Sequence, residues 1–175
     1  MKKFFVPIFL AAIAFKICSC SDAPVQSRFT ENYAEKWFDY YGGNIIYDES
    51  QTLELMEFPN TVFHYDGLNV TAESERYEIL MFSGMPIYNV YLSDLTGDGL
   101  PEFCSAVSIG SGIIDYRIIV YDYSSSTEYQ LSDRFHSKYF LTLEDGLLTV
   151  HQIPIGEVED VSGRLVLRDG ELAIE

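Results

Sequence analysis

Oxygen-bearing groups recur at alternate positions in the segment 94–102, which reads DLTGDGLPE. Loop positions 1, 3, 5, 7 and 9 are Asp94, Thr96, Asp98, the backbone carbonyl of Leu100, and Glu102. Calcium takes six to eight hard oxygen ligands in a flexible geometry, so a tight loop of this kind can direct several oxygens at one ion. The segment therefore predicts a calcium site with these five residues as ligands.

Two glycines in this loop, Gly97 and Gly99, permit the left-handed backbone that a tight turn needs. The same residues also fit a turn without an ion, in which Asp94 and Asp98 accept backbone N–H groups. Both interpretations stay open from the sequence. With three carboxylates, a calcium site would be weak, with a Kd of roughly 10⁻⁴–10⁻³ M.

The loop resembles the D-x-[DN]-x-D-G-x-x-[DE] calcium loops of the EF-hand, dockerin and FG-GAP classes. Thr96 departs from this pattern, because Asp or Asn stands at position 3. Ser105 occupies position 12, where an EF-hand carries a bidentate Glu on a helix. The sequence on both sides is strand-like, which makes the FG-GAP type the closer match.

The elements that must position this loop are predicted to be strands. Apolar and polar residues alternate with a period of two over most of the body, and Asp-Gly turns stand at 66–67, 145–146 and 169–170. We expect a mainly β, antiparallel single domain over 29–175, either sandwich-like or barrel-like. The expected strands are 53–58, 62–66, 68–72, 77–82, 85–92, 102–109, 116–123, 127–131, 139–143, 147–153, 164–167 and 171–174.

One N-terminal helix is expected between residues 29 and 41. Tyr33, Trp37 and Tyr40 fall on one stripe at helical spacing, and the glycine pair 42–43 would end the helix. We expect this aromatic stripe to pack on the β domain.

The N-terminus has the composition of an export signal. Lys2 and Lys3 precede an apolar run of twelve residues, 4–15. A helix of this length rises roughly 18 Å, which is short of the ~30 Å hydrocarbon core of a bilayer. The segment 1–19 is therefore predicted to be a signal peptide.

The end of this segment resembles a bacterial lipobox, with Ile17 three residues before Cys20 and Ser19 directly before it. Lys16 departs from the pattern, because a charge is unusual so close to the cleavage site. The resemblance implies that Cys20 is lipidated and that 20–28 is a tether. The protein would then be anchored to the outside of the cell membrane or of an outer membrane.

The charge of the chain excludes nucleic acid as a partner. There are 27 acidic and 11 basic residues, for a formal net charge of −16, and phosphate binding needs Lys and Arg. Hydrophobic residues make up 47% of the chain, which is enough for a packed core. After cleavage before Cys20, the only cysteine left in the body would be Cys104, so no disulfide framework is expected.

Three segments carry a further resemblance: 83–91 (SGMPIYNVY), 107–115 (VSIGSGIID) and 118–123 (IIVYDY). They are similar to an uncharacterised extracellular β-rich domain found in the C-terminal region of Gram-positive BlaR-type membrane metallopeptidases and in free-standing lipoproteins. The peptidase part of such proteins needs an H-E-x-x-H zinc helix. That motif is absent, because Tyr, Ser and Gln follow the three histidines, His64, His136 and His151. The resemblance therefore implies a sensor-like or accessory exterior module.

Together these patterns predict a non-catalytic binding or sensor module, attached to a membrane by its lipid and possessing one calcium site. Its ligand would be an unidentified protein or small molecule. A cell-wall or glycan hydrolase is one alternative and would need a cleft with paired carboxylates. An accessory partner of a membrane receptor or peptidase is the other.

Overall fold

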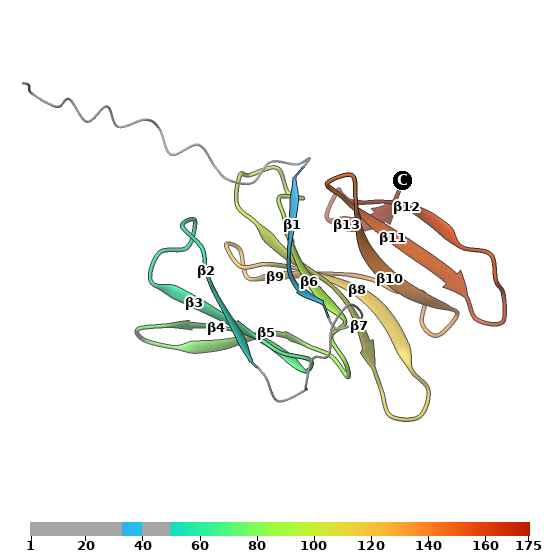
Figure 1. The fold of residues 1–175 in the computed structure, drawn as a ribbon, viewed down its shortest axis with the longest axis horizontal. Coiled ribbons are helices and arrows are strands. Elements are labelled where there is room, and N and C mark those ends of the chain that lie inside the picture. Colours follow the sequence, from blue (N-terminus) through green and yellow to red (C-terminus); the bar gives the residue numbers. More distant parts are fainter. Residues whose placement is uncertain (1–32, 40–49) are drawn as a thin grey trace, which may run out of the picture.

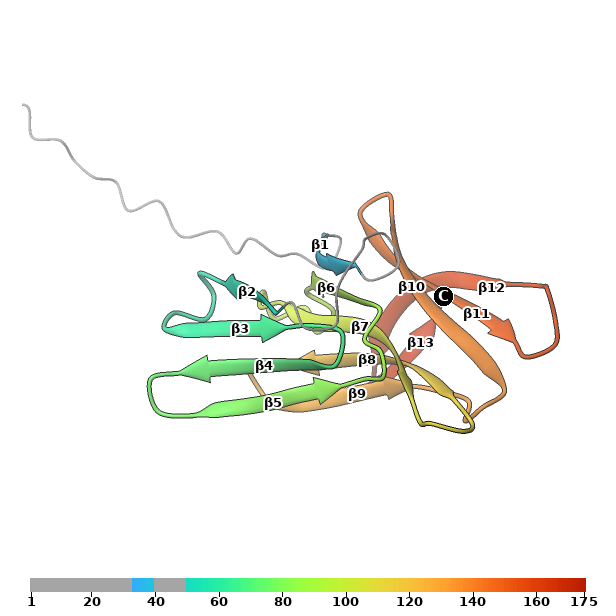
Figure 2. The same cartoon turned by 60° about the horizontal axis from the view of Figure 1, so that its bottom comes forward.

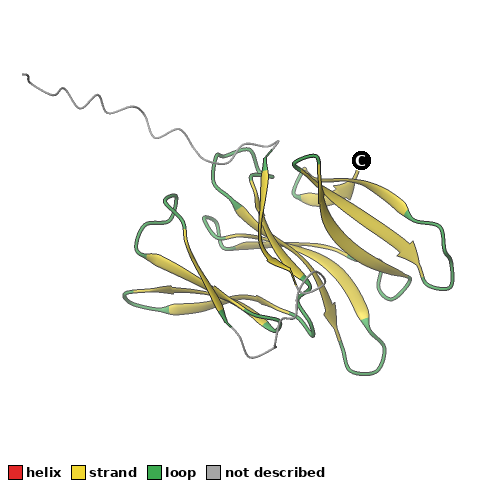
Figure 3. Cartoon of the chain, in the orientation of Figure 1, coloured by secondary structure: helices red, strands yellow, loops and turns green. Residues whose placement is uncertain are grey.

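The computed structural model describes residues 33–39 and 50–175, and these ranges form thirteen β-strands and no helix (Figure 3). This part of the chain consequently contains no helix that could cross a membrane. The strands are β1 (Ala34–Asp39), β2 (Gln51–Glu54), β3 (Thr61–Tyr65), β4 (Asn69–Ser74), β5 (Glu78–Ser83), β6 (Asn89–Ser93), β7 (Glu102–Ile109), β8 (Asp115–Asp122), β9 (Thr127–Leu131), β10 (Ser137–Glu144), β11 (Leu147–Pro154), β12 (Val161–Arg168) and β13 (Glu171–Ile174).

The strands form three antiparallel sheets (Figure 1). The first has the order β2-β3-β4-β5, the second β1-β6-β7-β8-β9 and the third β10-β11-β12-β13. The predicted mainly β, antiparallel architecture is therefore confirmed. None of the three described sheets closes into a barrel, so the barrel-like alternative is wrong.

The five-stranded sheet lies between the two four-stranded sheets, which stand on opposite sides of it in both views (Figures 1 and 2). Buried side chains fill a separate core on each of its faces. The N-terminal core contains Phe63 and Phe103, together with other residues of β1–β8 and of the loops that join them. The C-terminal core contains Ala106 and Leu141, together with other residues of β1, β6–β8 and β10–β13.

Burial on both faces explains the sequences of the central strands. Along β7, Phe103 and Val107 point into the N-terminal core, whereas Cys104 and Ala106 point into the C-terminal core. The residues of β6 and β7 are buried almost without exception. A strand with two buried faces has a nearly continuous apolar sequence instead of a strict alternation.

The helix predicted over 29–41 is wrong where the structure describes it, because Ala34–Asp39 forms strand β1 on the edge of β6. The register shifts just before Phe38, so Trp37 is an extra residue opposite β6. This bulge places Ala34 in the C-terminal core and Phe38 in the N-terminal core, although residues four apart in a regular strand share a face. The remainder of the predicted helix lies outside the described residues.

Turn chemistry fixes two of the hairpins. Asp145 and Gly146 have φ values of 51° and 83°, and Asp169 and Gly170 have values of 51° and 81°. Two consecutive positive φ angles define the type I′ turn, whose twist matches that of a two-stranded hairpin. These Asp-Gly pairs therefore form the hairpins that the sequence predicts.

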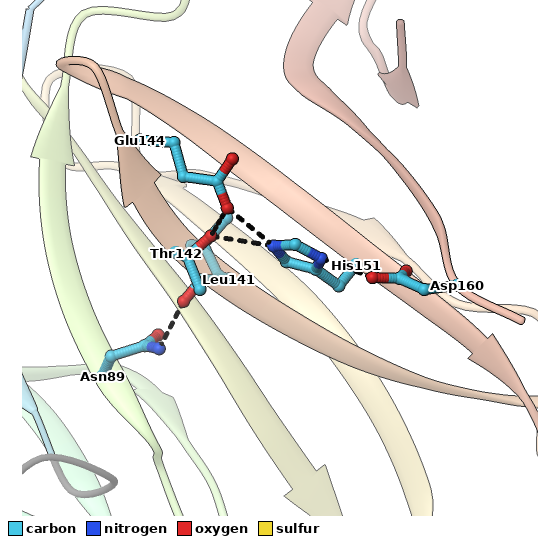
Figure 4. A network of polar contacts seen from close by, with 6 residues as sticks. All are labelled: Asn89, Leu141, Thr142, Glu144, His151 and Asp160. Atoms are coloured by element: carbon cyan, nitrogen blue, oxygen red, sulfur yellow. Dashed lines mark hydrogen bonds and ion pairs between the residues drawn. The ribbon is translucent and has the colours of Figure 1, made fainter. Parts of the chain in front are cut away.

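One buried amide joins the central sheet to the C-terminal sheet. Asn89 on β6 donates through Nδ2 to the carbonyl of Leu141 on β10, at 2.9 Å (Figure 4). Its Oδ1 accepts the N–H of Ala106 at 3.0 Å. The oxygen and the nitrogen of this buried amide are thus both hydrogen-bonded. The bond to Leu141 fixes the position of the C-terminal sheet relative to the central sheet.

Candidate metal centre

The predicted calcium loop connects two buried strands of the central sheet. β6 ends at Ser93 and β7 begins at Glu102, and these two residues are paired in the ladder. The loop between them is therefore closed at its base by main-chain pairing. Asp94 follows the end of β6 directly, so the sheet holds the first and last acids of the loop close together.

The three acids of the loop converge. One carboxylate oxygen from each of Asp94, Asp98 and Glu102 lies within 4.8 Å of the other two. Oxygens that share a calcium ion at about 2.3–2.6 Å are themselves up to about 5 Å apart. Asp94 is 3% exposed and Glu102 is fully buried, whereas Asp98 is exposed. The three acids therefore form a cluster that could hold a metal ion.

Asp94 also holds the loop in shape, because its side-chain carboxylate accepts main-chain N–H groups of the loop. Its Oδ1 accepts the N–H of Gly97 at 2.7 Å and its Oδ2 accepts that of Gly99 at 2.8 Å. Both glycines have positive φ angles, 77° and 85°, which glycine adopts without the steric cost that a Cβ brings. Asp98 makes a shorter turn of the same type, accepting the N–H of Leu100 at 2.8 Å.

Glu102 anchors the other end of the loop. Its Oε2 accepts the N–H groups of Leu95 at 2.5 Å and Thr96 at 3.3 Å. The hydroxyl of Thr96 donates to its Oε1 at 2.9 Å. This carboxylate is therefore both an internal cap for the loop and a potential metal ligand.

Burial raises the pKa of Glu102 to about 7. Hydrogen bonds from Leu95 and Thr96 oppose this rise, and the charge of the neighbouring Asp94 adds to it. A divalent cation between these carboxylates would favour their ionised forms, because the ion replaces repulsion between like charges by attraction.

The five predicted ligands take different positions. Asp94, Asp98 and Glu102 come together, as described above. Thr96 lies beside Glu102 and uses its hydroxyl hydrogen there, although a hydroxyl oxygen keeps lone pairs that can bind a cation. Leu100 donates its N–H group to the Asp98 carboxylate in the turn. The predicted lipidation residue, Cys20, lies outside the described residues.

The two interpretations of the loop are physically compatible. The backbone-capping turn is present, because Asp94 and Asp98 accept N–H groups of the loop. A carboxylate oxygen has two lone pairs, so an oxygen that accepts one N–H can also bind a cation. The sequence did not reveal how completely Glu102 is buried, because its burial depends on the packing of the central sheet against its neighbours.

The loop also lies beside the C-terminal sheet. Asp94 and Leu95 line a surface hollow together with Arg164 and Arg168 of β12. The guanidinium of Arg168 forms an ion pair with Glu175. Asp94 therefore lies where the end of β6 meets β12 of the C-terminal sheet.

The three histidines of the sequence lie apart from one another and from the acidic cluster. His64 is on β3 beside Glu73, and His151 is on β11. His136 follows β9, and its Nδ1 is 2.7 Å from the carbonyl of Asp133. Cys104 is a buried free thiol whose pKa is raised by burial and by the charge of Glu102.

The chain matches no protein-family model, no curated protein sequence and no solved structure. The resemblance to the exterior domain of BlaR-type metallopeptidases therefore stays a prediction carried by the residues quoted for it. What the structure itself establishes is a three-sheet β protein with an acidic cluster that could hold a metal ion at the β6–β7 junction.

Proposed function

We propose that this protein is an exported, non-catalytic binding or sensor module, stabilised by one calcium ion in the loop 94–102. The observation that carries the metal site is the convergence of the carboxylates of Asp94, Asp98 and Glu102 within 4.8 Å. Export and attachment through a lipidated Cys20 are supported by the N-terminal sequence pattern.

The donor set favours calcium over other metals. All of the predicted ligands are oxygens, and hard oxygen ligands suit calcium and magnesium, whereas zinc and copper prefer His and Cys. Magnesium requires a near-ideal octahedron at shorter distances and usually keeps several waters. The loop combines a fixed, buried Glu102 with an exposed Asp98, which suits the more tolerant coordination of calcium.

A calcium ion at this position would strengthen the centre of the fold. It would join the end of β6 to the start of β7, which are paired through Ser93 and Glu102. An ion that binds only the folded state stabilises it by mass action. The proposed role of the ion is therefore structural, with recognition carried by other surfaces of the module.

The alternative of a glycan hydrolase is less well supported by this cluster. Glycosidases use two carboxyl groups with separated pKa values on either side of the bond that they cleave. Asp94 and Glu102 are close together, and the pKa of Glu102 is about 7. However, Glu102 is fully buried and Asp94 is 3% exposed, so a sugar could not reach between them without opening the loop.

The partner of the module is proposed to be a protein or small ligand outside the cell. An accessory role beside a membrane receptor or peptidase is the alternative within this proposal. Capture of partners from the native envelope separates the two, because an accessory protein would retain a membrane protein after stringent washing. A free-standing binder would retain none.

The calcium part of the proposal is tested by thermal unfolding of the purified protein in excess calcium and in chelator. At a calcium concentration of about 10–100 times the Kd, the stabilisation is about 1.4–2.7 kcal/mol. For a protein of this size, that corresponds to a rise in Tm of roughly 3–10 °C. Asp98→Ala should abolish the calcium-dependent rise.

Asp66→Ala is the matched control. Asp66 also accepts two backbone N–H groups in a turn, those of Leu68 at 2.7 Å and Asn69 at 2.8 Å, but it lies outside the acidic cluster. This variant should be less stable and should keep the calcium-dependent rise in Tm. Equal Tm values for the unmodified protein in calcium and in chelator would remove the calcium site from the proposal.

A further inference from the structure

A histidine on the outer face of the C-terminal sheet contacts carboxylates through both ring nitrogens (Figure 4). His151 follows Val150, which points into the C-terminal core, so His151 points away from that core. Its Nδ1 lies 2.7 Å from Oδ2 of Asp160 and its Nε2 lies 3.1 Å from Oε1 of Glu144. Oγ1 of Thr142 is 3.0 Å from the same Nε2.

This network reaches from the sheet to the loop that joins β11 to β12. The ladder between these two strands ends at the pair Gln152–Val161. Asp160 is the first residue beyond that pair and the last residue of the loop. The contact between His151 and Asp160 therefore fixes the end of the loop 155–160 to the sheet.

The protonation state of the ring decides how many carboxylates it can bind. A neutral imidazole has one N–H and one lone pair, so one of the two carboxylates must then face the lone pair. The charged groups that face the ring are Glu144 from β10 and Asp160 from the loop, while its partner on β12 is the uncharged Ser162. Only the imidazolium can donate a charge-assisted hydrogen bond to both carboxylates.

We infer that His151 is a pH-sensitive latch, which holds the loop 155–160 against the sheet when protonated and loosens it when neutral. The sequence of this loop, IGEVED, carries three acids and no base. A positive ring is thus the counter-charge for an acidic segment. The loop also carries Val158, which is 96% exposed, so the latch controls the mobility of an apolar side chain at the surface.

The direction of the His151 pKa supports this device. Burial lowers the pKa, but hydrogen bonds and charges from Asp160 and Glu144 raise it more, so the net shift is upward from 6.5. A group with a raised pKa in the folded state stabilises that state while it is protonated. The contribution is complete below the unfolded pKa of about 6.5 and disappears as the pH rises through the folded value.

Amide hydrogen exchange, followed by NMR on the purified protein, tests the latch. Protection factors of the loop amides are compared at about pH 5 and about pH 8.5, on either side of the ordinary histidine pKa. Excess calcium is present at both pH values so that the state of the loop 94–102 is held constant. In the unmodified protein, the loop should be about twofold better protected at the lower pH, since an exposed ion pair contributes only a few tenths of a kcal/mol.

Two variants and one control decide the origin of the difference. His151→Gln and Asp160→Asn should each remove it, and Asp160→Asn leaves the histidine and the sheet intact. His64→Gln should keep it, because His64 contacts Glu73 on the N-terminal sheet. Equal protection at both pH values in the unmodified protein would overturn the inference, as would a pH difference that persists in Asp160→Asn.

Discussion

The loop 94–102 and the network around His151 both bring several carboxylates together, but the fold assembles them differently. The loop is one continuous segment closed by the Ser93–Glu102 pair, and its acids Asp94 and Glu102 are buried. The His151 network draws on two strands and a loop and stands on an outer face, where the Glu144 side chain is 55% exposed.

This difference sets the energies involved. Buried charges and hydrogen bonds are costly to disrupt, because the groups left behind cannot turn to water. Exposed ion pairs contribute about 0–1 kcal/mol, since solvent screens them and the side chains lose entropy. The loop with its two buried acids should therefore contribute more to stability than the exposed network, whose main effect should be on local motion.

The largest effect should follow from Glu102→Ala. This change leaves the N–H groups of Leu95 and Thr96 and the Thr96 hydroxyl without their acceptor, and it empties the fully buried place of the Glu102 side chain. We expect a loss of about 2–4 kcal/mol in the free energy of unfolding, measured with urea, from the lost side-chain volume and the unsatisfied donors. Glu102→Gln keeps a carbonyl acceptor and should lose less. A loss below about 1 kcal/mol for Glu102→Ala would show that buried acceptors do not hold this loop.

Asp122 offers a second buried turn carboxylate, outside the acidic cluster. It accepts the N–H groups of Ser124 at 2.8 Å and Ser125 at 3.2 Å, and both serine hydroxyls. Asp122→Ala should therefore lower the free energy of unfolding by about 1–2 kcal/mol, equally with and without calcium. A calcium-dependent loss would mean that Asp122 also takes part in binding the ion.

The stabilisation that Asp122 provides should depend on pH in the acidic range. Burial raises the pKa of Asp122, but hydrogen bonds from Ser125 and Ser124 lower it more, so the net pKa is below 3.8. Its contribution is present above that ordinary value and is lost as the pH falls through the folded pKa. The stabilities of the unmodified protein and of Asp122→Ala should converge as the pH falls below 3.8. A gap that stays constant on acidification would contradict this assignment.

Alanine substitutions at two glycines, Gly97 and Gly112, separate the effect of backbone strain from that of steric clash. Gly97 has a φ of 77°, so Gly97→Ala should cost about 1 kcal/mol in the free energy of unfolding, although its Cβ would meet no atom within 4 Å. Gly112 likewise has open space around a Cβ, and its φ is not in the left-handed region. Gly112→Ala should leave the urea midpoint nearly unchanged. Equal midpoints for the two variants would argue against a left-handed Gly97.

The smallest effect belongs to the exposed network. Asp160→Asn should reduce the free energy of unfolding by about 0.3–0.5 kcal/mol at about pH 5. The effect should be smaller well above the pKa of His151, because the neutral ring keeps a single N–H and no longer attracts Asp160 by charge. Urea titrations at the two pH values check this. A loss above about 2 kcal/mol would mean that the network behaves like a buried one.

The same contrast explains what could be predicted from the sequence. β7 was expected at 102–109 and occupies Glu102–Ile109, because its limits are set by an adjacent turn sequence and a local apolar pattern. The cluster of Asp94, Asp98 and Glu102 was foreseen for the same reason, since all its members lie in one loop.

Features that depend on distant pairing were missed. β1 was expected to be helical because its aromatic residues have helical spacing, but pairing with β6 and the bulge at Trp37 decide its structure. The contact between His151 and Glu144 depends on the β10–β11 register, and no local signal in the sequence marks it. The full burial of Glu102 likewise follows from the stacking of three sheets.

Native mass spectrometry of the protein with added calcium tests the central claim most directly, with Asp94→Asn as the comparison. We expect one bound calcium per chain in the unmodified protein and a clear loss of that species in the variant, in which a neutral amide replaces a carboxylate of the acidic cluster. The same low, non-specific distribution of calcium adducts in both proteins would contradict it.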